Sequence, residues 1–407
     1  LEPSIGKGRD VGAAVSDRMF KKGENGRIPV VAVTGTNGKT TTVRLIEQIL
    51  RYHNLRVGFT GTEGVVVNGH LIDTGDCSGP KSAHKVLVHP EADAAVLECA
   101  RGGMLREGLG FDMCDVGIVT NIGEGDHLGL NFIDSVEDLA LLKSVLVQNV
   151  APNGLAVLNA DDKHAANMAK LTPGRVLFFT SNPDNPIVAA HKAKGRPVII
   201  HDGRVINISY DDIEKTIDLM DVPLTNNGLF TFQVQNVMCA VAAALGLNVP
   251  FNTIRAALGS FQSTPDTVPG RFNFFKHKGG SVIADYGHNP DAVSTLVNTL
   301  KNIPAVRRTV VISAAGDRRD HIVLYEDACQ RGRPDGETLA LLQQGIANAD
   351  SDKKPTVVEV RGEFKAIQMA LDETGPDHLV LVLLDQVNEA LQYLQENTTG
   401  EPARVSV

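Results

Sequence analysis

A glycine loop followed by a lysine and a threonine gives this sequence its clearest chemical signal. The loop reads VTGTNGKTT over Val33–Thr41. Its glycines let backbone N–H groups turn inward around a phosphate, Lys39 can reach the terminal phosphates, and the Thr40 hydroxyl can bind Mg²⁺. A plain turn between a strand and a helix is the simpler interpretation, but it does not need the Lys-Thr pair. We therefore predict a nucleotide phosphate site made of Thr34, Gly35, Thr36, Asn37, Gly38, Lys39, Thr40 and Thr41.

Acidic and histidine side chains follow two other apolar runs. Glu98 comes directly after Ala94–Leu97, and a loop with Asp126 and His127 follows Val116–Val119. Parallel strands place their ligands at their carboxyl ends, so Glu98 is suitably positioned to hold Mg²⁺ directly or through water. Asp126 and His127 are further candidate ligands. The alternatives are a salt-bridged strand-end glutamate, and a helix cap with a surface histidine.

The elements that must position these side chains are alternating strands and helices. The run Ile28–Val33 precedes the loop, and Thr42–Leu50 after it has apolar residues at helical spacing. Short apolar runs then recur between polar or helical stretches, which is typical of a mostly parallel sheet covered on both faces. The runs are Ala94–Leu97, Val116–Val119, Leu155–Leu158, Val176–Phe179 and Val198–Ile200. The pattern predicts an α/β fold.

A Ser/Thr/Pro-rich segment, Gln262–Pro269, marks a domain boundary after the helical segments Val234–Leu245 and Phe251–Leu258. A second series of strands and helices follows it: Val282–Asp285, Pro290–Leu300, Thr309–Ala314, Gly336–Asn348, Thr356–Val360, Glu363–Leu371, Leu379–Leu384 and Gln386–Gln395. We predict a linker over residues 1–27, a P-loop ATPase domain with a mostly parallel sheet over residues 28–265, and a smaller Rossmann-like α/β domain over residues 266–407.

Composition narrows the class of protein. The 407 residues, 43% of them hydrophobic, can bury the cores of two or three domains. A net charge of −9 gives no overall attraction to nucleic acid or to an anionic membrane. The basic cluster Lys192, Lys194 and Arg196 is either a solvated loop or a contact for an anionic polymer. Five cysteines without a C-x-x-C pair indicate neither a disulfide framework nor a zinc site. We expect a cytoplasmic protein that binds neither nucleic acid nor membrane.

Several separate runs carry a family resemblance. GTNGKT, Glu98 at its strand end, TNI with DHLG, LNADD at residues 158–162 and DYGHNP at residues 285–290 are similar to motifs of the Mur ligase superfamily, which includes peptidoglycan amino-acid ligases and folylpolyglutamate synthetase. GDCSGP, LECARGGMLREGLGFD, CDVGIVTNI and NPIVAAHKAKG resemble more closely the C-terminal, Mur-ligase-like half of the cyanophycin synthetase family. The run EPSIGKGRDVG at residues 2–12 resembles the linker that follows an ATP-grasp domain in that family.

This resemblance implies an ATP-dependent amide ligase that works through an acyl phosphate. Phosphoryl transfer depends mostly on positioning and electrostatics, which suits a phosphate loop with Mg²⁺. The implied catalytic residues are Lys39, His127, Lys143 and Arg271; Asn236, Arg271 and Asp285 would contact adenine, phosphates and ribose. Two Mg²⁺ ions would be held by Thr40, Glu98, His127 and a carbamylated Lys143. Two alternatives remain open: Asn236 as a helix cap, and Lys143 as an unmodified helix residue.

The resemblance also implies substrates and partners. Cyanophycin synthetases attach the α-amine of arginine to aspartate side chains of a polyaspartate backbone. The loop Glu326–Glu337 lies where the superfamily recognises its amino acid, although it is also readable as a charged surface loop. Its candidate residues are Glu326, Asp327, Arg331, Arg333, Asp335 and Glu337. The expected partners are the polyaspartate or cyanophycin chain, arginine, an upstream ATP-grasp domain and further copies in a homo-oligomer.

Two other functions stay open, namely another amino-acid ligase of the superfamily and a non-catalytic polymer-binding domain. A peptidoglycan ligase carries a UDP-binding domain before the P-loop, whereas 32 residues precede Val33. An inactive scaffold is expected to lose Lys39, Thr40, Glu98 or His127, and the sequence retains all four. One departure from the family concerns Asp320, which runs at once into apolar His321–Tyr325, where a parallel crossover needs ten or more residues, usually a helix. Either the helix was deleted or a segment is absent from the sequence.

Overall fold

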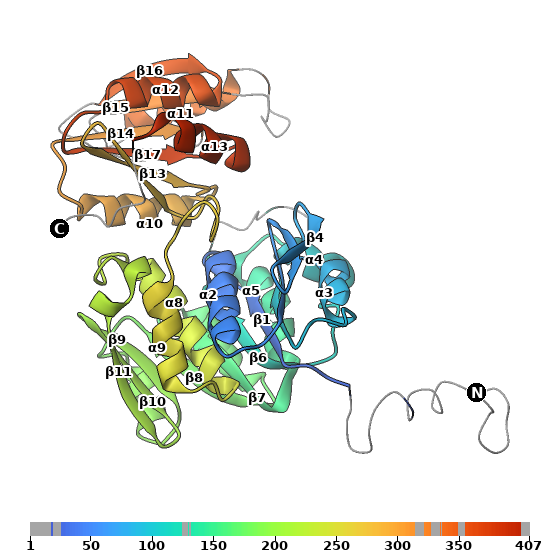
Figure 1. Cartoon of the computed structure of the whole chain (residues 1–407). Helices are drawn as coiled ribbons and strands as arrows, with labels where there is room; N and C mark the ends of the chain where they lie inside the picture. The colour runs from blue at the N-terminus through green and yellow to red at the C-terminus, as the bar shows by residue number, and fades with distance from the viewer. Residues whose placement is uncertain are drawn as a thin grey trace, which may run out of the picture.

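A computed structural model describes residues 18, 26–123, 129, 132–313, 321–326, 334, 336–348 and 355–399. These residues form two α/β units, each with its own sheet. The second unit lies against one end of the first, and helix α10 (Pro290–Lys301) runs along the side of the second unit that faces the first (Figure 1). The predicted α/β class, with a mostly parallel sheet in each of two units, is confirmed.

The first unit is built on an 11-stranded sheet with the order β11-β10-β9-β8-β7-β6-β1-β5-β2-β3-β4. Its strands are β1 Val30–Thr34, β2 Val57–Gly61, β3 Gly64–Val67, β4 His70–Thr74, β5 Ala94–Glu98, β6 Cys114–Val119, β7 Val150–Asn159, β8 Arg175–Thr180, β9 Val198–Asp202, β10 Val205–Tyr210 and β11 Ile213–Asp218. The seven central strands, β9-β8-β7-β6-β1-β5-β2, are parallel to one another. Antiparallel strands complete the two edges, β10 and β11 at one and β3 and β4 at the other.

Helices cover both faces of this sheet. Alternate residues of β1 face opposite cores, with Val31 and Val33 in one and Val30 and Ala32 in the other, as strand geometry requires. Helices α2 (Lys39–Tyr52), α8 (Thr231–Gly246) and α9 (Phe251–Ser260) pack in the first core, and α3 (Pro80–Leu87), α4 (Arg101–Glu107), α5 (Val136–Gln148), α6 (Lys163–Asn167) and α7 (Pro186–Lys192) in the second. A strand buried on both faces reads as the continuous apolar run seen in the sequence.

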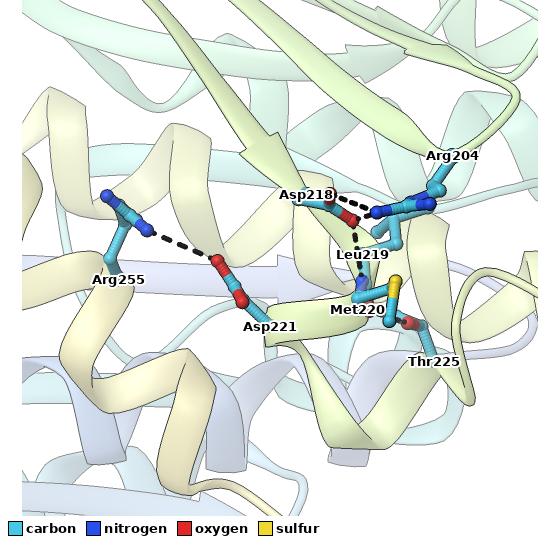
Figure 2. Close-up of polar contacts among 7 residues, drawn as sticks. All are labelled: Arg204, Asp218, Leu219, Met220, Asp221, Thr225 and Arg255. Carbon is cyan, nitrogen blue, oxygen red and sulfur yellow. Dashed lines mark hydrogen bonds and ion pairs between the residues drawn. The ribbon is translucent and has the colours of Figure 1, made fainter.

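Polar contacts fasten the β11 edge of this sheet to the helical layer. After β11 the chain makes a short 3₁₀ turn, Leu219–Asp221, which Asp218 caps by accepting from the Met220 N–H at 2.9 Å. Arg204 holds the same carboxylate, and Arg255 on α9 pairs with Asp221 at 3.2 Å (Figure 2). These contacts are exposed and lie outside the cleft described below, so we assign them a structural role.

The second unit has a six-stranded sheet with the order β12-β13-β17-β14-β15-β16. Its strands are β12 Asn273–His277, β13 Gly280–Asp285, β14 Arg307–Ile312, β15 His321–Glu326, β16 Thr356–Arg361 and β17 His378–Leu383. Its helices are α10, α11 Glu337–Asn348, α12 Glu363–Asp372 and α13 Val387–Asn397. In this second sheet the β12–β13 pair is antiparallel, and the other described strand pairs are parallel.

The structure differs from the sequence predictions mainly at the sheet edges. The predicted strands omit the internal strand β2 as well as β3, β4, β10, β11 and β12, which lie at or next to the sheet edges. Strands β14 and β15 are parallel neighbours, with Thr309 opposite His321. Residues 313–320 therefore join two parallel strands with fewer residues than a crossover usually needs, and residues 314–320 lie outside the described residues. In the part of the chain that the structure describes, no helix has the length and apolarity to cross a membrane.

Candidate active site

The glycine loop joins β1 to α2 at the carboxyl edge of the first sheet. Gly35 has φ +139°, and a Cβ atom there would lie 1.9 Å from the Thr120 hydroxyl oxygen. Gly38 has φ +89°, and its Cβ would lie 2.4 Å from Oδ1 of Asn236. Both positions need glycine for its backbone freedom and for space. The loop thus passes between the end of β6 and helix α8.

Asn121, which follows β6, holds the loop in its conformation. Its main-chain oxygen accepts from the Thr36 N–H at 2.8 Å, and its Oδ1 accepts from the Asn37 N–H at 2.9 Å. Its Nδ2 donates to the Asn37 carbonyl at 3.0 Å, and the Thr120 hydroxyl donates to the same carbonyl at 2.6 Å. The loop is thus rigidly positioned before a ligand binds. Asn121 lies in the TNI run of the sequence and has no predicted role of its own.

Two lysines meet at one carbonyl beneath the loop. Lys39 Nζ donates to the carbonyls of Gly35 and Thr36, each at 3.0 Å. Lys143 is fully buried in α5, and its Nζ also donates to the Gly35 carbonyl at 3.0 Å. Lys39 lines the cleft, whereas Lys143 is not among the lining residues. Thr34 is also buried below the loop, where its hydroxyl donates to the Cys99 carbonyl at 2.7 Å.

Thr40 and Glu98 form a pair of oxygen donors beside the loop. The Thr40 hydroxyl donates to Glu98 Oε2 at 3.0 Å, and Glu98 is 2% exposed. Burial raises the pKa of the Glu98 carboxyl, with Lys39 and Arg271 acting in the opposite direction. Glu98 Oε1 is buried and has no hydrogen-bond partner among the described residues. Mg²⁺ prefers oxygen ligands of this kind, so the donor set fits Mg²⁺.

The two metal-ligand candidates in the loop after β6, Asp126 and His127, lie outside the described residues. Within the described ranges, no group of three or more His, Cys, Asp or Glu side chains is arranged to hold a metal ion. The observed oxygen donors are therefore Thr40 and Glu98, and the role of His127 stays a prediction.

Asn236 lies inside α8 and supports the loop from the side. It is 5% exposed, its Nδ2 donates to Gln233 Oε1 at 2.9 Å, and its Oδ1 accepts from the Thr42 hydroxyl at 3.4 Å. Because α8 begins at Thr231, Asn236 is well past the helix start, and the alternative that it caps the helix is wrong. Asn236 also lines the cleft.

The second unit contributes the opposite wall of the site. Arg271 Nη2 donates across the cleft to the Thr62 hydroxyl at 3.4 Å, and its guanidinium lies 5.2 Å from the centre of the Tyr286 ring. Asp285 ends β13, and its Oδ2 accepts from the Phe272 N–H at 2.8 Å. The Arg271 side chain thus contacts Thr62 of the first unit and Tyr286 of the second unit.

These walls enclose a cleft of about 940 Å³ lined by residues of both units, a size typical of small-molecule sites. Its lining includes the predicted residues Thr36, Asn37, Gly38, Lys39, Thr40, Thr41, Glu98, Asn236, Arg271 and Asp285. Arg101 and Arg106 lie along the same cleft. The structure therefore gathers most of the described site candidates at one place.

The described residues of the loop Glu326–Glu337, which was predicted to recognise the amino-acid substrate, lie away from the cleft lining. Glu326 ends β15 and is 6% exposed, and its two carboxylate oxygens accept from the Gly336 N–H at 2.9 and 3.0 Å. Neither Glu326 nor Glu337, the first residue of α11, lines the cleft. In the described residues the Glu326 carboxylate fastens the chain before α11, and its role in substrate recognition stays a prediction. Asp327, Arg331, Arg333 and Asp335 lie outside the described residues.

Replacing Asp285 by asparagine is expected to stabilise the folded protein at neutral pH. Burial raises the pKa of Asp285 from 3.8 to about 6, although Arg271 opposes this shift. Between about pH 4 and pH 6 the folded state binds more protons than the unfolded state, so stability falls as pH rises through this window. Asp285→Asn removes up to about 3 kcal/mol of this cost and keeps an acceptor for the Phe272 N–H. This prediction is tested by measuring the melting temperatures of the parent and of Asp285→Asn from about pH 4 to pH 7. Equal melting temperatures for variant and parent near pH 7 would contradict a raised pKa for this half-buried carboxyl.

Two family patterns match the chain over the two units. The Mur ligase middle domain matches residues 33–244, and the glutamate ligase domain of the Mur ligases matches residues 270–383. The chain therefore belongs to the Mur ligase family of ATP-dependent ligases. More particularly, it is similar to cyanophycin synthetases: 38% identical to that of Trichormus variabilis, over 97% of this chain and 45% of the relative. The Nostoc sp. enzyme is 37% identical over the same shares.

The chain spans about half the length of these curated relatives. Among solved structures, E. coli FolC in complex with DHPP and ADP matches with a TM-score of 0.63 at 19% identity, over 91% of this chain and 88% of that one. A pseudomurein peptide ligase type C from Methanothermus fervidus matches with a TM-score of 0.61 at 20% identity, over 92% and 79%. At such identities the two structures support the fold. The resemblance predicted from the motifs is confirmed.

Proposed function

We propose that this chain binds ATP with Mg²⁺ in the cleft, transfers the γ-phosphoryl group to a carboxylate, and joins the resulting acyl phosphate to the amine of an amino acid. The observation that carries this proposal is the Thr40–Glu98 pair. Its buried, unpartnered oxygen lies beside the phosphate loop, in a cleft that both units line. A carboxylate is a poor electrophile, and phosphorylation gives it a good leaving group.

The residues of the chain have separate tasks in this reaction. The N–H groups of the loop bind phosphate oxygens, and Lys39 exchanges its two loop carbonyls for the terminal phosphates. Arg271 brings a second cation to the phosphates from the other unit, with a guanidinium that can make two parallel hydrogen bonds. Thr40 and Glu98 would hold Mg²⁺, which would neutralise the negative charge of the phosphates.

Lys143 is the proposed site of carbamylation. Lys143 and Lys39 both donate to the Gly35 carbonyl at 3.0 Å, so two ammonium groups would lie near one another in a largely buried place. Carbamylation occurs when the neutral amine of a lysine reacts with carbon dioxide. The product is an anion, which supports the proposal that Lys143 and His127 help to hold a second Mg²⁺.

The proposed substrates are arginine and the aspartate side chains of a polyaspartate or cyanophycin chain. The support is the similarity to cyanophycin synthetases over 97% of this chain. Arg101 and Arg106 in the cleft lining also suit an anionic polymer. From the same similarity to cyanophycin synthetases, we also propose that the chain is joined to an ATP-grasp domain and assembles into a homo-oligomer.

A substrate screen tests this function. ADP release is measured with Mg²⁺, ATP and a polyaspartate primer, with each proteinogenic amino acid supplied in turn. The proposal expects ADP release that needs both primer and arginine, with lysine a much poorer substrate, because a planar guanidinium is recognised more strictly than an ammonium. A preference for an acidic or apolar amino acid would indicate another ligase of the superfamily. No ADP release with any amino acid would favour a non-catalytic polymer-binding domain.

A further inference from the structure

Two asparagines from different units pair across the cleft. Asn289 Nδ2 donates to Asn37 Oδ1 at 3.0 Å, and Asn37 Nδ2 donates to Asn289 Oδ1 at 3.4 Å. Asn37 belongs to the phosphate loop, and Asn289 directly precedes α10. Helix α10 runs along the side of the second unit that faces the first (Figure 1). We call this reciprocal pair the amide clasp. Asn289 is 5% exposed, so water competes little for its hydrogen bonds.

Each partner of the clasp is fixed within its own unit. Asn121 holds the main chain of Asn37 through hydrogen bonds at 2.9 and 3.0 Å. Asn289 is the N-cap of α10, because its Oδ1 also accepts from the Ala292 N–H at 2.8 Å. Little movement is therefore available on either side, and the clasp sets the position of α10 relative to the phosphate loop.

A close contact beside the clasp shows how tightly the two units fit there. A Cβ atom on Gly123, in the loop after β6, would lie 2.1 Å from Oδ2 of Asp291 in the first turn of α10. The atom met is the end of the Asp291 side chain, so this distance shows that the carboxylate of Asp291 lies against the loop after β6. The first turn of α10 therefore sits directly against the loop that supports the phosphate site.

Besides the hydrogen bond from Arg271 to Thr62, the described contacts between the units include an aromatic cluster that is less specific in direction. Phe230, at the start of α8, packs on Phe272 of the connecting segment with ring centres 4.7 Å apart. Phe232 lies 5.4 Å from the same ring. Such an apolar cluster stabilises contact over a range of orientations, whereas paired amides hold only in a narrow geometry. The clasp is thus the contact that defines orientation at the phosphate loop.

We propose that the Asn37–Asn289 clasp positions the second unit for amine transfer, and that Asn289 is a positioning residue of the ligase reaction. This inference rests on the proposed function. With the clasp formed, the second unit covers the acyl phosphate and excludes water. With the clasp broken, water competes with the amine. Its oxygen bonds to the acyl carbon, the carbon–oxygen bond to phosphate breaks, and carboxylate and inorganic phosphate leave, so that ATP is consumed without an amide.

This assignment differs from the role that the sequence predicts for Asn37, which is direct contact with ATP. The side-chain amide of Asn37 forms both hydrogen bonds with Asn289, and the same amide would have to contact the nucleotide. A nucleotide contact at Asn37 alone would lower ATP affinity in an Asn37 variant and leave an Asn289 variant unaffected. The clasp predicts instead the same defect in both variants, because each removes the same pair.

The test compares Asn37→Ala, Asn289→Ser and the double variant with the parent protein. Serine keeps an N-cap for α10 but cannot form the amide pair. The matched control is Asn302→Ser, at the exposed opposite end of the same helix. The measurements are ADP released per amide bond formed, the dissociation constant of a fluorescent ATP analogue, and the melting temperature.

The clasp predicts about tenfold slower amide formation in each single variant, as expected for the loss of two neutral hydrogen bonds. ADP released per amide should rise well above the parent value, ATP affinity should change less than about twofold, and the double variant should match the singles. A ratio unchanged in Asn289→Ser would overturn the inference. So would a loss of ATP affinity confined to Asn37→Ala.

Small-angle X-ray scattering tests the clasp apart from any ligase activity. The radius of gyration of Asn289→Ser should exceed that of the parent and of Asn302→Ser, because the units lose their fixed orientation. Equal radii would contradict the clasp even if the parent forms amides. A larger radius together with no amide formation by the parent would support the clasp as a contact while refuting the proposed function.

Discussion

Replacing Lys39 by alanine is expected to lower the rate of ATP-dependent amide formation at least about a hundredfold, the loss typical of removing a preorganised transition-state contact. The Lys39 side chain is half-buried over its own loop, where it donates to the Gly35 and Thr36 carbonyls and fills no apolar core. The fold should therefore be retained. The rate of ADP release at saturating ATP, with circular dichroism for folding, is the measurement.

Lys81→Ala is the control for this variant, because Lys81 is an exposed lysine that pairs with Glu107 at 3.2 Å on the surface. It should have the parent rate. A Lys39→Ala protein that retains more than about a tenth of the parent activity would be incompatible with a phosphate-binding lysine whose removal costs several kcal/mol.

Replacing Glu98 by glutamine is the second variant with a large expected effect. Glutamine has nearly the same shape and still accepts from the Thr40 hydroxyl, but it lacks the negative charge that a divalent cation requires. We expect a rate about a hundredfold lower at low Mg²⁺, partly restored as Mg²⁺ is raised. Because burial opposes the charge of Glu98, the melting temperature should equal or exceed that of the parent. Rates titrated with Mg²⁺ measure the effect.

Glu47→Gln provides a matched control. Glu47 is also a buried glutamate, 7% exposed, and burial raises its pKa, but it lies on α2 beside Arg51 and does not line the cleft. Its Mg²⁺ dependence should be that of the parent. If Glu98→Gln also keeps the parent's Mg²⁺ dependence, then Glu98 does not hold the metal.

Residues in compact motifs were the most predictable from sequence. Gly38 and Thr40 are fixed by a strand, a loop and a helix that adjoin in sequence, and Glu98 comes from the end of a neighbouring parallel strand. Local geometry and one rule about strand ends are enough to bring them together. Asn236 depends on α8 packing beside the loop, and its place was inferred from the family resemblance alone.

Contacts between distant segments were not predictable. Thr62 meets Arg271 because the β2–β3 hairpin reaches the cleft, and nothing in the spacing of residues 57–67 indicates that contact. Edge strand β4 exposes Leu71 and Ile72, so it lacks the alternation that identifies a half-buried strand. The burial of Glu326 was not predictable either, because a charge pattern predicts solvent exposure, whereas the backbone N–H of Gly336 allows this carboxylate to be buried.

The most direct test of this account follows oxygen atoms from the carboxylate substrate to phosphate. A polyaspartate primer labelled with ¹⁸O in its side-chain carboxylates is incubated with ATP, Mg²⁺, arginine and the protein, and the inorganic phosphate is analysed by mass spectrometry. An acyl phosphate intermediate predicts ADP as the nucleotide product and one ¹⁸O atom in the phosphate for each amide bond formed. AMP and pyrophosphate as products, or phosphate free of label while amide bonds form, would contradict the account.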